Sequence, residues 1–287
     1  MNTLHLAHKL KKKYRKPFIY DSHELFIERD KQIVPPEWYK NLQRKFEKKR
    51  IKKANGVITV SNSIGHELVE RYGIEYPVLI YNTPHYYEVG NQISVREKLN
   101  LPVSTKIIMY SGGFTIGRGL EVLIKSIKYF PKNYHLVLLG FGNPEFVSML
   151  NNIAKTEGIE SQFSIYGPVA SKEVPLYLGS ADLCISPIQN VALNNYYSCP
   201  NKVFEYIQAR VPMALSNFPE LQRIIDEEQI GVTFDPSDSK NIAASVEKFL
   251  NDESAYKTAI NNIELSAKKY NWENEEKKLL ALYSKLN

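Results

Sequence analysis

Short apolar segments alternate with amphipathic ones along most of this 287-residue chain, and this alternation most restricts its fold. The apolar segments are unbroken runs, and helical periodicity follows most of them. Parallel strands joined by helices are covered on both faces, so they lack the polar alternation of half-buried strands. The pattern therefore predicts an α/β protein with doubly wound parallel sheets. The expected strands are 17–21, 56–61, 76–82, 106–112, 135–140, 162–167, 182–187, 211–216 and 231–236.

A polar segment bounded by prolines, residues 84–105, interrupts the alternation and predicts a domain boundary. We expect a first domain over 1–103, a second over 104–269, and a charged amphipathic helix over 270–287. Doubly wound domains have about five or six strands, and only three precede residue 84, so the first domain is expected to be incomplete. Helices are predicted at 119–130, 144–157, 172–180, 201–210, 219–228 and 239–251.

Positive charge is concentrated in the first fifth of the chain. Residues 1–56 hold 16 of the 37 Lys and Arg residues but only 6 of the 31 Asp and Glu residues. Two runs carry this charge, "KLKKKYRK" (9–16) and "RKFEKKRIKK" (44–53), and the second belongs to a predicted basic amphipathic helix. A solvated helix face and attraction to an anionic membrane surface both explain the pattern. No nucleic-acid partner is expected, because aromatic-interleaved binding motifs are missing.

The sequence favours a cytoplasmic protein, with peripheral binding at the inner membrane face as an extension of this prediction. No apolar run approaches the roughly 20 residues of a membrane-spanning helix. The start, "MNTLHLAHKLKKKYRK", lacks the apolar stretch and cleavage site of a secretion signal. Cys184 and Cys199 have no metal-ligand spacing, so no structural zinc site is expected. No other cofactor is expected.

The stretch "YSGGFTIGRGLEVLIKSI" (110–127) predicts a strand, a glycine-rich turn and a helix that opens near Gly119. Backbone amides at such a turn attract anions, and glycines let a phosphate approach the main chain. Arg118 would add a charge-assisted contact to a diphosphate. The glycine spacing matches neither the dinucleotide fingerprint nor the Walker motif. A tight structural turn is therefore the alternative interpretation.

The stretch "PNKVFEYIQARVP" (200–212) places Lys202 and Glu205 one helical turn apart, just after a strand and a polar loop. Open α/β sheets bind ligands at the carboxyl ends of their strands. A lysine there could neutralise phosphate, and a carboxylate could accept hydrogen bonds from both hydroxyls of a ribose. The alternative is a surface ion pair worth under about 1 kcal/mol.

The stretch "IYDSHELFIE" (19–28) places His23 directly after the first expected strand. A histidine there could carry a proton or donate a hydrogen bond to a sugar. A helix-capping role for Asp21 or Ser22 explains the same polar cluster equally well.

Taken together and in order, several stretches resemble the retaining glycosyltransferases of the GT-B fold, family 4. They extend over nearly the whole chain. They are "YDSHELFIE", "ANGVITVSNSIGHELVERYG" with "VLIYNTP", "YSGGFTIGRGLEVLIKSI", "SIYGPV" with "EVPLYLGSADLCISPI", "CPNKVFEYIQARVPMALSNFPELQRII" with "GVTFDPSD", and "YNWENEEKKLLALY". This resemblance implies two Rossmann-like domains that face each other across a cleft, with the terminal helix crossing back to the first.

The resemblance also assigns roles to residues of the nucleotide-sugar side. It implies that Glu205 holds the donor ribose, while Arg118 and Lys202 are the catalytic cations on the diphosphate. Gly113 would lie beside the leaving group, and the base would lie near Gly167 and Pro168. Catalysis would be largely electrostatic, with cationic side chains and helix dipoles stabilising the departing diphosphate without a metal.

On the acceptor side, the resemblance implies that His23 lies near the transferred sugar. The implied reaction moves a sugar, of the hexosyl type, from a nucleotide-sugar to a glycan or lipid-linked acceptor with retention, in cell-envelope polysaccharide assembly.

The sequence departs from the family pattern in two places. Tyr197 stands eight positions before Glu205, where the family has a second glutamate that contacts the donor sugar. In addition, the earliest strands of the first domain, with their glycine-rich turn, are not in the sequence. The alternative prediction is a nucleotide-sugar-binding fragment that is non-catalytic, or that a partner chain completes by supplying the missing strands.

Overall fold

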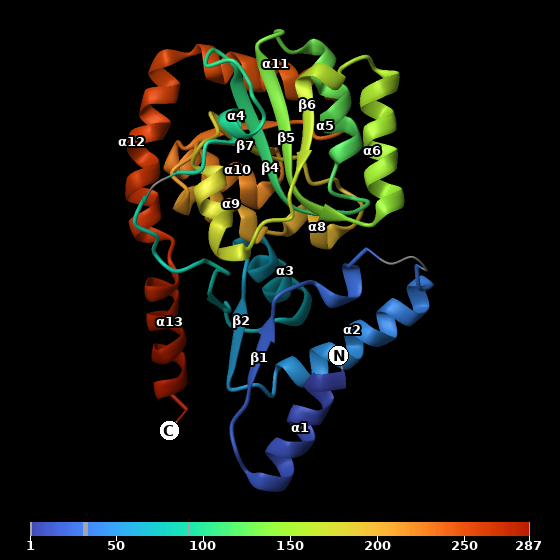
Figure 1. Ribbon diagram of the computed structural model, residues 1–287. Helices are drawn as coiled ribbons and strands as arrows, with labels where there is room; N and C mark the ends of the chain where they lie inside the picture. The colour runs from blue at the N-terminus through green and yellow to red at the C-terminus, as the bar shows by residue number, and fades with distance from the viewer. Residues whose placement is uncertain (1, 31–33, 91, 287) are drawn as a thin grey trace. The chain divides into compact units, whose positions relative to one another are not determined.

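The computed structural model describes residues 2–30, 34–90 and 92–286 (Figure 1). The chain forms two compact units. Unit 1 comprises Met1–Asn82, Asn190–Cys199 and Trp272–Asn287, and unit 2 comprises Thr83–Gln189 and Pro200–Asn271. Each unit is built on its own parallel sheet.

The sheet of unit 2 has the strand order β6-β5-β4-β7-β8-β9, and every pair of neighbours is parallel. This is the order of a doubly wound dinucleotide-binding domain, in which the topology reverses between β4 and β7. Ligands of such sheets bind outside the carboxyl ends of the strands at this point. The strands are β4 (Lys106–Phe114), β5 (Tyr134–Gly142), β6 (Phe163–Tyr166), β7 (Leu183–Ser186), β8 (Met213–Ser216) and β9 (Gly231–Phe234).

Helices cover both faces of this sheet (Figure 1). On one face, α5, α6 and α11 pack on Ile108 and Leu138 in a single apolar cluster. Ile107 and Val137, which alternate with these residues along the strands, are equally buried, so the other face is covered as well. There, α7, α9 and α10 contact β4, β7 and β8 in turn. The helices of unit 2 are α4 (Val95–Lys98), α5 (Leu120–Ser126), α6 (Pro144–Thr156), α7 (Val174–Leu178), α9 (Asn201–Gln208), α10 (Pro219–Glu228), α11 (Ser239–Asn251) and α12 (Glu253–Lys269).

The segment after Thr83 packs on unit 2. The backbone N–H of Val95 donates to Ser180 Oγ at 3.2 Å, and Arg96 Nη2 donates to Asp182 Oδ2 at 3.1 Å. The prediction placed residues up to 103 in the first domain, whereas the compact units divide at Asn82. The predicted and observed boundaries differ because these contacts join residues more than 80 positions apart. Local composition does not reveal such long-range contacts.

Unit 1 contains β1 (Ile19–Ser22), β2 (Gly56–Thr59) and β3 (Val78–Leu79) in a parallel sheet. On one face, an apolar cluster joins Ile51 of α2 to Ile64 and Leu68 of α3. On the other face, Leu282 of α13 packs against Ile58 and Ile80. The helices of unit 1 are α1 (Asn2–Tyr14), α2 (Glu37–Ile51), α3 (Asn62–Tyr72), α8 (Leu193–Tyr197) and α13 (Trp272–Ser284).

Each expected strand overlaps an observed one, which confirms the α/β class with parallel sheets. The basic amphipathic segment is α2, and the predicted terminal helix is α13 of unit 1. Helix α12 was not among the predicted helices, because its buried face is largely small or polar, with Ala259, Ser266 and Ala267. The incompleteness of the first domain stays a prediction. Among the described residues, no helix is long and apolar enough to span a membrane.

Candidate active site

The glycine-rich turn after β4 lies at the switch point of the sheet in unit 2. Gly117 and Gly119 have φ angles of +83° and +75°, in the left-handed region that favours glycine. A Cβ on Gly119 would lie 1.9 Å from the carbonyl oxygen of Pro187, which follows β7. The turn after β4 therefore packs directly on the loop after β7.

Three glycines lie side by side at the carboxyl ends of β4, β5 and β6. Gly112 is paired in register with Gly140, and a Cβ on Gly140 would lie 1.9 Å from the Gly112 carbonyl oxygen. Gly167, joined to Pro168 by a cis peptide bond, lies next to Gly140 in turn. Gly113 differs from these residues, because a Cβ there would meet no atom within 4 Å. The space beside Gly113 at this edge of the sheet is therefore open.

Lys202, near the start of α9, reaches this edge. A Cβ on Gly112 would lie 3.3 Å from Lys202 Nζ, and the same nitrogen is 4.0 Å from the centroid of the Tyr110 ring. Burial, with the positive charge of Arg118 adding to its effect and Glu205 opposing it, lowers the pKa of Lys202 to about 7. The negative charge of Glu205 therefore does not fully neutralise the Lys202 ammonium group. Such a pKa shift is typical of a lysine in an anion-binding site.

Glu205 lies one turn further along α9 and, together with Arg118 and Lys202, forms a cluster of charged residues. Burial raises its pKa, while Lys202 and the hydroxyl of Ser111 oppose that shift. Burial also raises the pKa of Tyr110 to about 12, with Arg118 and Glu205 as its charged neighbours. Both Lys202 and Glu205 are partly buried. The surface ion pair that their spacing also allowed is therefore not what forms in unit 2.

The packing of α9 fixes these two side chains. Val203, Phe204 and Ile207 are fully buried beneath the helix. Tyr206 is also buried, and its hydroxyl donates to the Ile185 carbonyl oxygen of β7 at 3.0 Å and accepts from the Ser111 N–H of β4 at 3.3 Å. These contacts fix α9 against β4 and β7 at the switch point. The position of the helix in turn determines where Lys202 and Glu205 lie.

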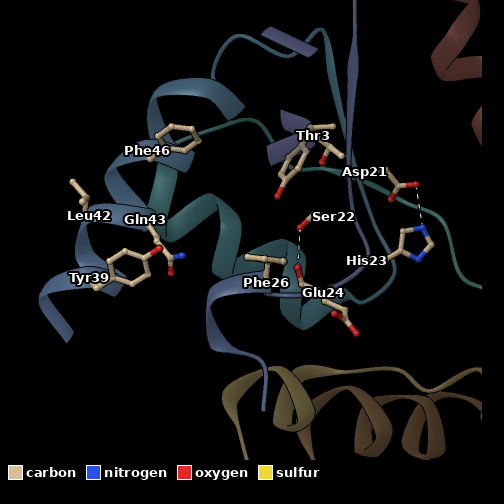
Figure 2. A pocket seen from close by; sticks show the side chains of 11 residues that line it. Thr3, Asp21, Ser22, His23, Glu24, Phe26, Tyr39, Leu42, Gln43 and Phe46 are labelled. Atoms are coloured by element: carbon tan, nitrogen blue, oxygen red, sulfur yellow. Dashed lines mark hydrogen bonds and ion pairs between the residues drawn. The ribbon is translucent and has the colours of Figure 1, made fainter. Parts of the chain in front are cut away.

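His23 lies in unit 1, just after β1. Its Nε2 is 3.0 Å from Asp21 Oδ2 (Figure 2). Asn82 Nδ2 lies 3.3 Å from its Nδ1. Ser22 Oγ donates to the Glu24 carbonyl oxygen instead of capping a helix. The capping alternative is therefore wrong, since the short turn η1 (Phe26–Glu28) has no side-chain cap. The polar cluster instead includes His23, which is among the residues that line a pocket in unit 1.

Tyr197, which replaces the second glutamate of the family pattern, has a packing role in unit 1. Its ring packs against the cluster formed by Ile64, Leu68 and Tyr72. Its carbonyl oxygen accepts a hydrogen bond from Ser61 Oγ, the N-cap of α3. A carboxylate at this position would lose the contact that the partly buried Tyr197 ring makes with this cluster.

The structure adds residues that sequence reasoning did not assign. Tyr110 lies under Lys202, Gly140 lies between Gly112 and Gly167, and Asn82 contacts His23. The signal for Tyr110 was its place just before the glycine-rich turn. Gly140 and Asn82 gave no comparable signal, because their roles depend on strand pairing and on a contact between distant residues.

Two Rossmann-like units, one of which has a charged cluster at its switch point, form the architecture of GT-B glycosyltransferases. The chain belongs to the family described as glycosyl transferases group 1, whose model matches residues 91–266. A second model, described as glycosyltransferase family 4, matches residues 2–83. The two matches together extend over both units.

Curated relatives are glycosyltransferases. An uncharacterized glycosyltransferase of Methanocaldococcus jannaschii is 25% identical over 236 residues, which are 79% of this chain and 59% of that protein. A D-inositol 3-phosphate glycosyltransferase of Xylanimonas cellulosilytica is 28% identical over 99 residues, which are 34% of this chain and 24% of that protein. The chain thus spans less than two thirds of the length of either relative.

Solved structures share the fold. The match to sucrose-phosphate synthase of Thermosynechococcus elongatus has a TM-score of 0.79 at 20% identity and covers 99% of this chain and 71% of that chain. The match to Anabaena HepE in complex with UDP has a TM-score of 0.80 at 17% identity and covers 99% of this chain and 76% of that chain. These likenesses confirm the GT-B-like fold.

Proposed function

We propose that this chain is part or all of an enzyme that transfers a sugar from a nucleotide-sugar to a glycan or lipid-linked acceptor, with retention of configuration. The observation that carries the proposal is the cluster of Arg118, Lys202 and Glu205 at the switch point of unit 2. Nucleotides bind at this point in doubly wound sheets. The family membership of the chain gives the class of reaction.

In this proposal, Arg118 and Lys202 contact the diphosphate and Glu205 accepts from the ribose hydroxyls. Lys202 suits this role because its ammonium group is held by Tyr110 without a full counter-charge. The bare edge at Gly113 leaves room for a phosphate, and the base would lie near Gly167 and Pro168. Anabaena HepE has been solved with UDP-glucose, which supports a nucleotide-sugar as the donor.

Charge stabilisation of the leaving diphosphate then drives the reaction. As negative charge develops on the diphosphate, the fixed cations Arg118 and Lys202 stabilise it without the reorganisation that water would need. We propose that no metal ion is required. Activity should therefore survive excess EDTA, and a loss that added Mg²⁺ or Mn²⁺ restores would contradict this part of the proposal.

For the acceptor side, we propose that His23 contacts the acceptor or the transferred sugar, with Asp21 and Asn82 orienting its ring. The cellular role proposed is cell-envelope polysaccharide assembly at the inner membrane face. The exposed apolar side chains Trp38 and Leu42 support binding at that face, because they project from α2, which also carries Lys48 and Lys49. Sedimentation with phosphatidylglycerol but not with phosphatidylcholine vesicles would test this role.

A second candidate is a nucleotide-sugar-binding fragment without independent activity. It is favoured by Tyr197, which packs in the apolar cluster where the family pattern has a carboxylate. In this candidate, a partner chain could supply further strands to unit 1. It predicts donor binding without turnover.

A thermal-shift panel of nucleotide-sugars tests the donor assignment. Ligand binding to the folded state adds about 2.7 kcal/mol of stability at a hundredfold excess over the dissociation constant. At least one nucleotide-sugar should raise the melting temperature of the chain. The absence of any shift across uridine, guanosine, adenosine and thymidine donors would overturn the proposal.

Turnover of the stabilising donor then separates the two candidates. Proton NMR of the product, taken before mutarotation, should show the anomeric configuration of the donor. Donor binding without transfer or slow donor hydrolysis would favour the fragment.

A further inference from the structure

The pocket of unit 1 has two chemically different ends (Figure 2). It has a volume of about 730 Å³ and is formed by α1, by β1 with the loop after it, and by α2. Figure 2 shows Tyr39, Leu42 and Phe46 of α2 on one side and Asp21 with His23 on the other. The pocket therefore combines an apolar wall with a polar end.

The polar end suits an uncharged, hydroxyl-bearing group. Asp21 and Glu24 supply carboxylate oxygens that accept hydrogen bonds from hydroxyls, and His23 supplies a ring nitrogen. No lysine or arginine is among the described residues that line the pocket. Arg29 lies beside it, but its Nη1 already pairs with Glu24 Oε2 at 3.0 Å, so a phosphate would have to compete with that carboxylate. A sugar ring has the complementary set of donors.

Gln43 adds a polar group on the α2 side of the pocket, beside Tyr39 (Figure 2). Its Oε1 atom is buried and has no hydrogen-bond partner within the described parts of the chain. A buried acceptor without a partner costs about 1–3 kcal/mol, and a hydroxyl entering the pocket would remove that cost. This observation is independent of the shape of the pocket, and it also indicates a ligand with hydroxyl groups.

The apolar wall is more exposed than a structural core would leave it. Leu42 is 58% exposed and Tyr39 is 41% exposed, although both line the pocket. An exposed apolar wall next to a polar end indicates a ligand with an apolar part. A free monosaccharide would use the polar end and leave this wall in contact with water.

We propose that this pocket binds the acceptor, and that the acceptor is an amphiphile with an uncharged sugar and an alkyl or prenyl chain. The sugar hydroxyls lie toward His23, Asp21 and Gln43, and the chain lies along Tyr39, Leu42 and Phe46. This inference rests on the proposed function and narrows the acceptor from any glycan to a lipid-linked one.

Isothermal titration calorimetry with two glucosides tests the proposal. The probes are n-octyl and methyl β-D-glucopyranoside, with the octyl compound kept below its micelle-forming concentration. Their sugars are identical, so any difference reports the alkyl chain. Burial of two methylene groups alone would strengthen binding by about tenfold, and we expect at least this difference. Equal binding of the two glucosides, or no measurable binding of the octyl glucoside, overturns the proposal.

A matched pair of variants locates the binding. Leu42→Gln should reduce octyl glucoside affinity by about tenfold. Leu280→Gln should leave it unchanged, because Leu280 is a similarly exposed leucine, 60% against 58%, on α13 of the same unit and does not line the pocket. Both changes lie on exposed positions, so both variants should fold. Equal losses in the two variants would indicate unspecific detergent binding and overturn the proposal.

A failure of this acceptor proposal can be distinguished from a failure of the proposed function. Nucleotide-sugar binding depends on residues of unit 2, so it should persist in Leu42→Gln. Intact donor binding without a preference for octyl glucoside refutes the amphiphilic acceptor alone. If the wild-type chain binds no nucleotide-sugar, the proposed function is refuted instead.

Discussion

Lys202 Nζ lies 4.0 Å from the centroid of the Tyr110 ring, with Arg118 as a positively charged neighbour. The cation–π contact only partly replaces the water that burial removes. The pKa of Lys202 therefore falls to about 7. In the free chain, this lysine is charged at pH 6 and largely neutral at pH 8.

Donor binding should consequently weaken as the pH rises. A bound diphosphate favours the protonated lysine, so binding above pH 7 requires proton uptake. We expect the affinity for a nucleotide-sugar to fall about tenfold between pH 6 and pH 8, as measured by calorimetry. Lys202→Met should bind weakly at both pH values, whereas Lys155→Met, on the exposed side of α6, should keep the wild-type profile. A pH-independent wild type would contradict this account.

Two glycines of the same edge should respond differently to alanine. Gly113→Ala meets no atom within 4 Å, so its melting temperature should match the wild type. Its nucleotide-sugar affinity should nevertheless fall, because the new methyl group occupies the space proposed for a phosphate. Gly140→Ala should lose more than about 3 kcal/mol of stability, since its Cβ would lie 1.9 Å from the Gly112 carbonyl oxygen. Denaturant unfolding and calorimetry measure both effects, and unchanged binding by Gly113→Ala would refute the proposed contact.

Much of the fold could be predicted because parallel strands buried on both faces appear in the sequence as unbroken apolar runs. The segment "KIIMYSG" became β4, whose Ile107, Ile108 and Met109 are all buried. The assignment of residues 83–103 was not predictable in the same way, because hydrogen bonds such as Val95 N to Ser180 Oγ hold that segment on unit 2.

The same contrast applies to the site. Lys202 and Glu205 could be proposed because helical spacing places them on one side of α9. Tyr110 and Gly140 could not be assigned, because their roles follow from the β4–β5 register and from the packing of α9. Asn82 contacts His23 across 59 positions, and no local pattern reveals such a pair.

His23 should affect turnover more than donor binding. Its ring is oriented by Asp21 and Asn82 within unit 1, while the proposed donor contacts belong to unit 2. His23→Ala should therefore lower kcat by at least about tenfold and leave the nucleotide-sugar thermal shift unchanged. His66→Ala, at an exposed position on α3, is the matched control. Steady-state kinetics check the prediction, and wild-type kcat in His23→Ala would remove the proposed role.

Glu275 should stabilise the attachment of α13 to unit 1. Its Oε2 accepts a hydrogen bond from the Tyr81 N–H at 3.0 Å and one from Lys278 Nζ at 2.7 Å. Glu275→Ala leaves the buried Tyr81 N–H without this partner, so we expect a loss of about 1–3 kcal/mol. The adjacent Glu276→Ala should be nearly neutral, because Glu276 is exposed. Urea unfolding of the two variants gives the comparison, and equal stabilities would contradict the expected role of the buried carboxylate.

The central claim is that Glu205, with Arg118 and Lys202, holds the nucleotide part of a sugar donor. Its most direct test is calorimetric titration of the stabilising nucleotide-sugar into the wild type, Glu205→Ala and Glu160→Ala, the last of which changes an exposed glutamate of unit 2. Hydrogen bonds to a charged group contribute about 1.5–3 kcal/mol each. The account predicts a tenfold to hundredfold loss of affinity, roughly, in Glu205→Ala and wild-type affinity in Glu160→Ala. Unchanged affinity in Glu205→Ala would contradict it.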